Sequence, residues 1–148
     1  MSATEEIILK IKELNPDIIA PITKKYNDPE YGGSKIVVCG KPGTGKTTLI
    51  TSLLYAKKHI IPTGIVMSGS EDSNGHYRKV FPSSFVFNEY NEEKVKDFIK
   101  RQKMAKIHLP NPWAFLLLDD CTDDPRIFNN PLMHGLFKRG RHWKILYI

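Results

Sequence analysis

One short segment of this 148-residue chain carries the residue types that hold a chain of phosphates. Residues 40–47 read GKPGTGKT, which fits the pattern G-x-x-x-x-G-K-[ST]. Its three glycines let the backbone wrap closely and adopt positive φ, so that successive N–H groups face a phosphate at a helix amino terminus. In such a loop Lys46 reaches the β- and γ-phosphates, and the Thr47 hydroxyl binds Mg²⁺. The pattern therefore predicts a site for ATP and Mg²⁺ with these nucleotide-binding residues: Gly40, Lys41, Pro42, Gly43, Thr44, Gly45, Lys46, Thr47 and Thr48.

A second segment supplies acids for the same chemistry. Residues 113–120 read WAFLLLDD, an apolar run that ends in two carboxylates. Many buried strands stop at Asp, but downstream of a phosphate-binding loop this run indicates a Walker B strand. Asp119 is then expected to act with Thr47 at the metal, by orienting the Mg²⁺ waters. Asp120 is placed to polarise the attacking water, although a helix-capping or supporting role for Asp120 stays open.

The elements that must position these two segments alternate along the chain. Alternating strands and helices predict an α/β fold, a parallel sheet covered by helices on both faces. An extra strand–helix unit separates the loop from the acidic strand, which is typical of the three-layer, RecA/AAA-like division of P-loop NTPases. Members of that division usually work as rings. The pattern predicts strands at 35–40, 63–69, 83–90, 113–120 and 144–148, and helices at 41–59, from Asn91 onward and at 127–138.

The first residues of the chain and its composition limit the remaining predictions of domain organisation and location. Residues 1–34 predict a short amphipathic helix and a polar lead-in, and residues 35–148 predict one ATPase core. The net charge of +6 permits binding to nucleic acid without requiring it. No apolar run is long enough for a membrane span, and no secretory signal is present. We therefore expect an intracellular, reducing environment, in which Cys39 and Cys121 are free thiols.

Four segments of the sequence together resemble a known family. They read VVCGKPGTGKTTLI, YRKVFPSSFVFNEYNEEKVKDFIKRQ, FLLLDDC and FKRGRHWKILYI. They are similar to the genome-packaging ATPases of large DNA viruses, the poxvirus-type branch of the FtsK/HerA superfamily, over residues 35–148. The resemblance implies a homo-oligomeric ring that hydrolyses ATP with Mg²⁺ and pumps double-stranded DNA into a capsid. It also implies capsid or portal-vertex proteins as partners, and the virion or the viral factory in the host cytoplasm as the location.

The resemblance also bears on two arginines near the end of the sequence. It implies that Arg139 or Arg141 is an arginine finger, which would complete hydrolysis in a neighbouring subunit. By charge alone the same residues predict a basic surface turn. The polar sensor of the family follows the strand expected at 144–148, so we expect a core that lacks its C-terminal strands. Asp120 departs from the Glu that much of the superfamily carries at this position.

Several interpretations stay open beside the motor. A small P-loop kinase is disfavoured by the extra strand and by the lack of an Arg-rich lid segment, and a non-catalytic nucleotide-binding assembly module is the third reading. The lysine-rich helix after Asn91 could face DNA, but a solvated helix face is the simpler expectation. Core or rim packing is expected for four aromatic residues, although one of them could stack on a base: Tyr55, Tyr77, Trp113 and Trp143.

Overall fold

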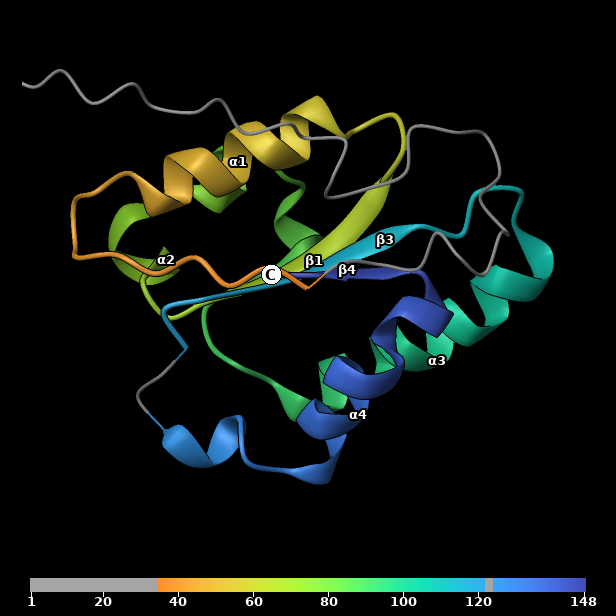
Figure 1. The fold of residues 1–148 in the computed structure, drawn as a ribbon. Coiled ribbons are helices and arrows are strands. Elements are labelled where there is room, and N and C mark those ends of the chain that lie inside the picture. The colour runs from red at the N-terminus through yellow and green to blue at the C-terminus, as the bar shows by residue number, and fades with distance from the viewer. Residues whose placement is uncertain (1–34, 122–123) are drawn as a thin grey trace, which may run out of the picture.

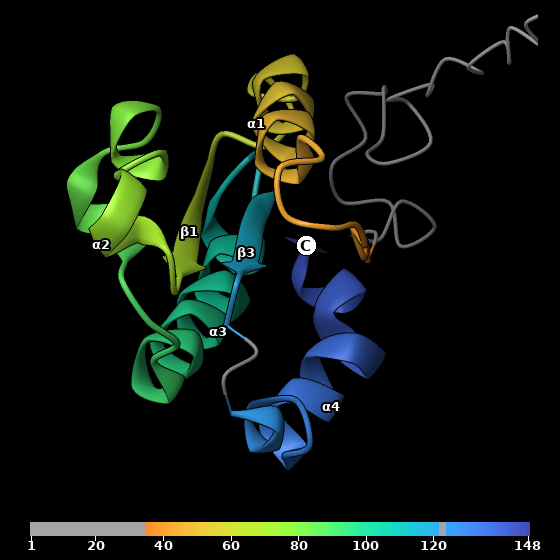
Figure 2. The same ribbon diagram turned by 90° about the vertical axis from the view of Figure 1, so that its left-hand side faces the viewer.

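The computed structural model describes residues 35–121 and 124–148, which form an α/β fold around a four-stranded parallel sheet. The strands are β1 (Thr63–Ser68), β2 (Val86–Phe87), β3 (Ala114–Asp119) and β4 (Ile145–Tyr147). Their order across the sheet is β2-β1-β3-β4 (Figures 1 and 2). β1 and β3 pair along their whole length, so Ser68 lies opposite Asp119. The carboxyl ends of the strands therefore share one edge, where the acidic pair of the sequence lies.

Helices cover both faces of this sheet. One face is covered by α1 (Lys46–Ala56), and the other by α3 (Glu92–His108) and α4 (Pro131–Arg139) (Figure 1). This arrangement confirms the predicted parallel α/β sheet. The remaining helical segments are short: α2 (Glu71–Asn74) and the 3₁₀ helices Tyr77–Lys79, Ser83–Phe85, Pro125–Ile127 and Gly140–Trp143.

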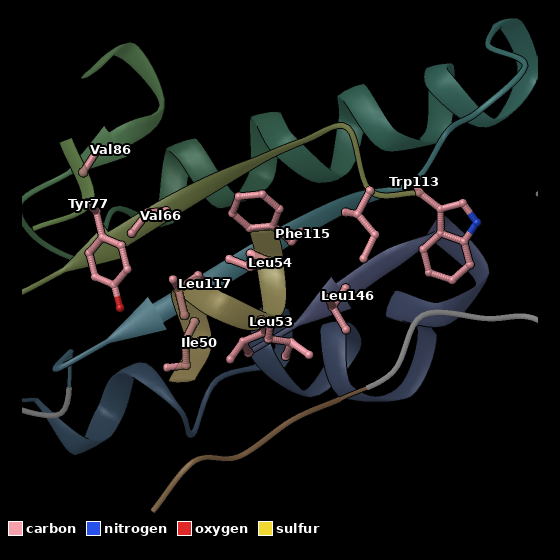
Figure 3. Packing of buried hydrophobic residues seen from close by; sticks show 12 residues of the cluster. Ile50, Leu53, Leu54, Val66, Tyr77, Val86, Trp113, Phe115, Leu117 and Leu146 are labelled. Carbon is pink, nitrogen blue, oxygen red and sulfur yellow. The ribbon is translucent and has the colours of Figure 1, made fainter. Parts of the chain in front are cut away.

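The two faces hold two apolar clusters. Alternate residues of a strand point to opposite faces, so Leu117 packs toward α1 while Leu116 packs toward α3 and α4. Figure 3 shows the cluster beneath α1, where Trp113 is fully buried at the start of β3. Cover on both faces explains why the β3 sequence is continuously apolar instead of alternating.

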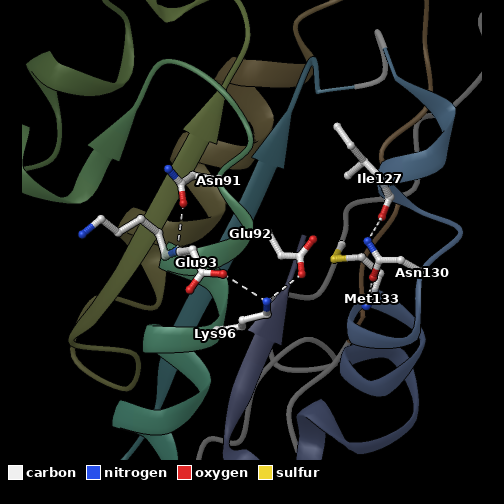
Figure 4. Close-up of polar contacts among 8 residues, drawn as sticks. Asn91, Glu92, Glu93, Lys96, Ile127, Asn130 and Met133 are labelled. Carbon is white, nitrogen blue, oxygen red and sulfur yellow. Dashed lines mark hydrogen bonds and ion pairs between the residues drawn. The ribbon is translucent and has the colours of Figure 1, made fainter.

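Asparagine caps begin the two helices of the second face. The Asn91 side chain accepts a hydrogen bond from the Lys94 N–H at 3.0 Å, which confirms the predicted cap of α3. Asn130 does the same for the Met133 N–H at 2.9 Å (Figure 4). The single helix predicted at 127–138 is wrong in its start, because Pro131 occupies the first turn of α4.

Three other predicted boundaries differ from the structure. Of the strand predicted at 35–40, only one parallel bridge forms, between Lys35 and Tyr147 of β4. The strand predicted at 83–90 shrinks to β2, since its first residues form a 3₁₀ turn after Pro82. Of the helix predicted at 41–59, only Lys46–Ala56 is helical, because Gly43 and Gly45 have positive φ in the loop before it. The segment predicted for residues 1–34 lies outside the described residues.

Gln102 ties α3 to the turn that precedes β4. Its side chain is fully buried, and its Nε2 lies 2.9 Å from the Pro112 carbonyl, 3.1 Å from the Trp143 carbonyl and 3.3 Å from the Lys144 carbonyl. Lys144 has a positive φ of 57°, which reverses the chain there. The amide of Gln102 thus fixes the turn that carries Arg141.

We expect Gln102→Leu to lower the free energy of unfolding by about 2–4 kcal/mol, because buried carbonyls lose their donor while the volume hardly changes. Urea denaturation measures this loss. Lys106→Gln, an exposed change on the same helix, is the control and should stay within about 0.5 kcal/mol of the unmodified chain. Equal stability of the two variants would contradict the clamp.

Both cysteines are free, as the sequence predicts, but their environments differ. Cys39 is exposed, whereas Cys121 is buried and donates a hydrogen bond to the Met67 carbonyl at 3.3 Å. Burial raises the pKa of the Cys121 thiol to about 11. The Cys121 thiol therefore stays protonated at neutral pH, and a protonated thiol reacts slowly.

At pH 8 iodoacetamide should modify Cys39 in the folded chain and leave Cys121 intact, and both should react in urea. Mass spectrometry of the alkylated peptides checks this. The raised pKa has a defined sign, since Cys121 should become reactive in the folded chain only as the pH approaches 11. Modification of both thiols at similar rates under native conditions would show that the Cys121 site opens readily.

Candidate nucleotide-binding site

The glycine-rich segment forms a tight loop directly before α1. Gly43 and Gly45 have positive φ values of 75° and 87°, a conformation that other residues rarely adopt. Gly40 has no positive φ, and its role is close approach: a Cβ at this position would lie 2.7 Å from the Thr44 hydroxyl. Thr44 closes the loop, since both its N–H and its hydroxyl bond the Lys41 carbonyl. The loop therefore leads its backbone into the amino terminus of α1.

Lys46 reaches back across this loop from the first residue of α1. Its ammonium group donates to the Gly40 carbonyl at 2.7 Å and to the Lys41 carbonyl at 3.0 Å. A lysine ammonium has three hydrogens, so a third remains for a ligand. The two carbonyl bonds hold a positive charge at the opening of the loop.

Three side chains from distant parts of the chain meet beside the loop. The Thr47 hydroxyl lies 3.4 Å from Asp119 Oδ2, although the two residues are 72 positions apart. The Tyr77 hydroxyl donates to the same carboxylate oxygen at 2.7 Å. The fold thus joins the two predicted metal-binding residues and adds a tyrosine that fixes the carboxylate.

Tyr77 is a site residue that the sequence reasoning missed. The sequence predicts core or rim packing for Tyr77, and the side chain is indeed only 1% exposed, with its ring stacked on Phe81. Burial, and next its hydrogen bond to Asp119, raise the pKa of Tyr77 well above its ordinary value, so its hydroxyl remains a donor. Residues 77 and 119 belong to different elements, and no local spacing in the sequence links them.

The segment that carries Tyr77 is anchored on both sides. The buried Glu71 carboxylate accepts hydrogen bonds from the Tyr77 N–H at 3.0 Å and the Arg78 N–H at 2.9 Å. His76 Nε2 lies 3.0 Å from the Thr51 hydroxyl, which in turn bonds the Thr47 carbonyl on α1. These contacts fix Tyr77 relative to the loop.

Asp120 follows β3 in a left-handed conformation, with φ of 54°. Its backbone is pressed against Gly69, where an added Cβ would lie 2.2 Å from the Asp120 carbonyl oxygen. Glycine at 69 is therefore required for this close approach. The cap of the next 3₁₀ helix is Asp124, whose carboxylate accepts from the Arg126 N–H at 3.0 Å. Asp120 is exposed and is among the residues that line the cavity described next.

A cavity of about 720 Å³ lies between the loop and the carboxyl ends of the strands. Two exposed phenylalanines, Phe128 and Phe137, add an apolar wall, whereas the four aromatics named from the sequence do not line it. Of the predicted site residues, the lining includes Pro42, Gly43, Lys46, Thr47, Asp119 and Asp120, and does not include Gly40, Lys41, Thr44, Gly45 or Thr48.

The two candidate arginines lie away from this cavity. Arg141 is in the 3₁₀ helix directly before β4, at the amino ends of the strands, whereas Asp119 is at their carboxyl ends. Arg139 ends α4, and its guanidinium carbon lies 5.5 Å from the centre of the Trp143 ring. The structure therefore does not bring either arginine to the glycine-rich loop of the same chain.

The donors at the loop suit Mg²⁺. A hydroxyl and a carboxylate oxygen are hard ligands of the kind Mg²⁺ prefers, and they converge at Thr47 and Asp119. Over residues 35–121 and 124–148 no group of three or more His, Cys, Asp or Glu could hold a metal by itself. One hydroxyl and one carboxylate suit an ion that takes its remaining ligands from substrate phosphates and water.

Comparison with known proteins places the chain among viral sequences. No family model and no solved structure matches it. It is 54% identical to uncharacterized protein 075L of Invertebrate iridescent virus 6, over all of this chain and 56% of that protein. It is 47% identical to uncharacterized protein 088R of Invertebrate iridescent virus 3, over 97% of this chain and 55% of that protein.

A third relative comes from a virus of a vertebrate host. Uncharacterized protein 015R of Frog virus 3 is 41% identical over 93% of this chain and 43% of that protein. The chain spans about half the length of the relatives it matches. Within the part of the chain that the structure describes, no helix is long and apolar enough to cross a membrane.

Proposed function

We propose that this chain binds ATP with Mg²⁺ at residues 40–48 and hydrolyses it. The observation that carries the proposal is the meeting of Thr47, Asp119 and Lys46 at one cavity, directly after a loop with two positive-φ glycines. A glycine turn without a ligand needs no carboxylate brought from another strand. The proposal therefore rests on the combination of loop and acid.

Each residue has a role that follows from its chemistry. The loop N–H groups and the Lys46 ammonium would hold the β- and γ-phosphates. Thr47 and Asp119 would hold Mg²⁺, which when bound neutralises charge on the phosphate oxygens. The Asp120 carboxylate would accept a hydrogen bond from the attacking water and orient it.

We further propose a RecA/AAA-like P-loop motor that moves double-stranded DNA in genome packaging, with capsid or portal-vertex proteins as partners. The strand arrangement supports this class. β4 pairs with β3 on one side, and on the other side Tyr147 of β4 pairs with Lys35 and Ile36, in the segment that leads to the glycine-rich loop. The viral relatives suit a location in the virion or the viral factory.

ATP hydrolysis measured with and without duplex DNA, over a range of protein concentrations, tests this function. The motor requires hydrolysis that rises with duplex DNA and a specific activity that rises as the ring assembles. Phosphate transfer to a small acceptor, with no effect of DNA, would favour a kinase instead. Nucleotide binding without turnover under all conditions would favour an assembly module.

Arg141 is our choice for a finger that acts on a neighbouring subunit, because Arg139 is held against Trp143. Arg141→Ala and Lys46→Ala should each be inactive alone. A mixture should recover hydrolysis, since some sites combine an intact Lys46 with an intact Arg141 from the neighbour. No recovery under conditions where the two variants co-assemble would count against a finger that acts between subunits.

A further inference from the structure

A second depression, of about 310 Å³, lies between α3 and α4 on the face of the sheet away from α1. We call it the α3–α4 groove, and its polar lining consists of four cationic side chains and one indole. The lining residues that matter for its chemistry are Lys96, Lys100, Lys103, Arg139 and Trp143. None of them belongs to the nucleotide cavity.

Two cations of the groove are held on one aromatic ring. The Lys103 ammonium lies 5.3 Å from the centre of the Trp143 ring, and the Arg139 guanidinium carbon lies 5.5 Å from it. Both distances are within the range of a cation–π contact. The half-buried indole therefore attracts one cation from each of two helices, and this attraction offsets part of the repulsion between the two cations.

This charge is largely unneutralised. Lys96 is paired with Glu92 at 2.8 Å and with Glu93 at 3.1 Å (Figure 4). No ion pair to a carboxylate joins Lys100, Lys103 or Arg139 within the described ranges of the chain. A shallow site with three such cations attracts an anion of more than one charge.

The shape of the groove selects an extended anion. Lys100 and Lys103 lie at i and i+3 on one face of α3, about 4.5 Å apart along its axis. Lys96, which is paired with Glu92 and Glu93, lies one turn before them. Arg139 lines the same groove from α4 and can offer a planar fork to phosphate oxygens. Three cations that are spread over two helices fit neighbouring phosphates better than one small ion.

We propose that the α3–α4 groove binds the phosphate backbone of double-stranded DNA. The choice of duplex as partner rests on the proposed function, whereas the charge and shape of the groove do not. The sequence alone favoured a solvated face for these lysines. Arg139 and Trp143, which the fold brings opposite them, favour a binding surface. Contacts to phosphates carry no sequence information, so binding should not depend on base order.

Filter binding of labelled duplex DNA to the whole chain, over a series of salt concentrations, tests the groove. The variant is Lys100→Gln with Lys103→Gln. The matched control is Lys94→Gln with Lys106→Gln, which removes the same charge from exposed positions on the same helix. Each lost phosphate contact should reduce the slope of log K against log salt by about 0.9.

The groove variant should therefore show a slope shallower by about 2 and an affinity about 10- to 100-fold weaker near ~0.1 M salt. The control should change the affinity by no more than a few fold. Arg139→Gln added to the groove variant should weaken binding again. Equal effects of the groove and control pairs would overturn the proposal. So would a groove variant that keeps duplex DNA but loses a poly-glutamate peptide, because the surface would then dock protein.

Nucleotide binding, measured on the same variants without DNA, separates this proposal from the previous one. It should be unchanged in both pairs, since neither contacts residues 40–48. A chain that binds duplex through the groove but binds no ATP would end the proposed function and leave the groove intact. A chain that binds ATP, but whose affinity for duplex DNA does not depend on the groove residues, would end the groove proposal and leave the proposed ATP site intact.

Discussion

Lys46→Ala should reduce ATP hydrolysis by two orders of magnitude or more, on the order of what removal of one positioned charge-stabilising donor costs. The ammonium is held at the loop by the Gly40 and Lys41 carbonyls. Among residues 35–121 and 124–148, no other Lys or Arg lines this cavity and could replace it. Release of inorganic phosphate from ATP measures the loss. Binding of labelled ATP should fall in parallel.

Lys41→Ala is the matched control for this change. Lys41 contributes its backbone carbonyl to the loop, and its side chain does not line the cavity. Its loss should change hydrolysis only a few fold. Lys46→Ala with full activity, or Lys41→Ala with an equal loss, would mean that the phosphates do not lie where the loop geometry indicates.

Asp119→Asn should be the second severe variant, again with hydrolysis reduced by about 100-fold. The amide keeps the shape of the side chain and can still accept from the Tyr77 hydroxyl, but it removes the negative charge beside Thr47. The Mg²⁺ concentration needed for half-maximal ATP binding should therefore rise strongly. ATP binding titrated with Mg²⁺ measures this separately from turnover.

Tyr77→Phe is the informative partner of Asp119→Asn. It keeps the charge of Asp119 and removes only the hydroxyl 2.7 Å away, so we expect a loss of about 10- to 30-fold, the lower part of the range for one hydrogen bond to a charged group. Its Mg²⁺ dependence should shift in the same direction as that of Asp119→Asn, but less. An unchanged Mg²⁺ dependence of ATP binding in Tyr77→Phe would show that the Tyr77 hydroxyl does not support the metal site.

The sequence predicts those features that depend on local order. The loop at 40–47, the acidic end of β3 and the Asn91 cap each follow from a few neighbouring residues and the physics of helix and strand ends. The parallel sheet follows from the alternation of elements. The strand predicted at 35–40 pairs at a single bridge only, because β-branched composition alone does not fix how far a segment pairs with its neighbour.

The sequence could not predict the contacts that depend on tertiary placement. Tyr77 reaches Asp119 because Glu71 and His76 hold its segment against α1. From the sequence, the lysines of α3 predict a solvated helix face. In the structure, Arg139 of α4 lines the same groove as these lysines. In both cases the partners lie in different elements, and no spacing rule connects them.

The two tryptophans give this chain two independent optical probes. Trp113 is fully buried beside β3, so its emission should be shifted to the blue and should respond only to unfolding. Trp143 lies half-buried among Lys103 and Arg139, so its emission should change whenever an anion displaces those cations. In Trp143→Phe, Trp113 is the one tryptophan that remains, and the emission is that of the core. The difference between the two spectra then reports occupancy of one surface in solution, without a label.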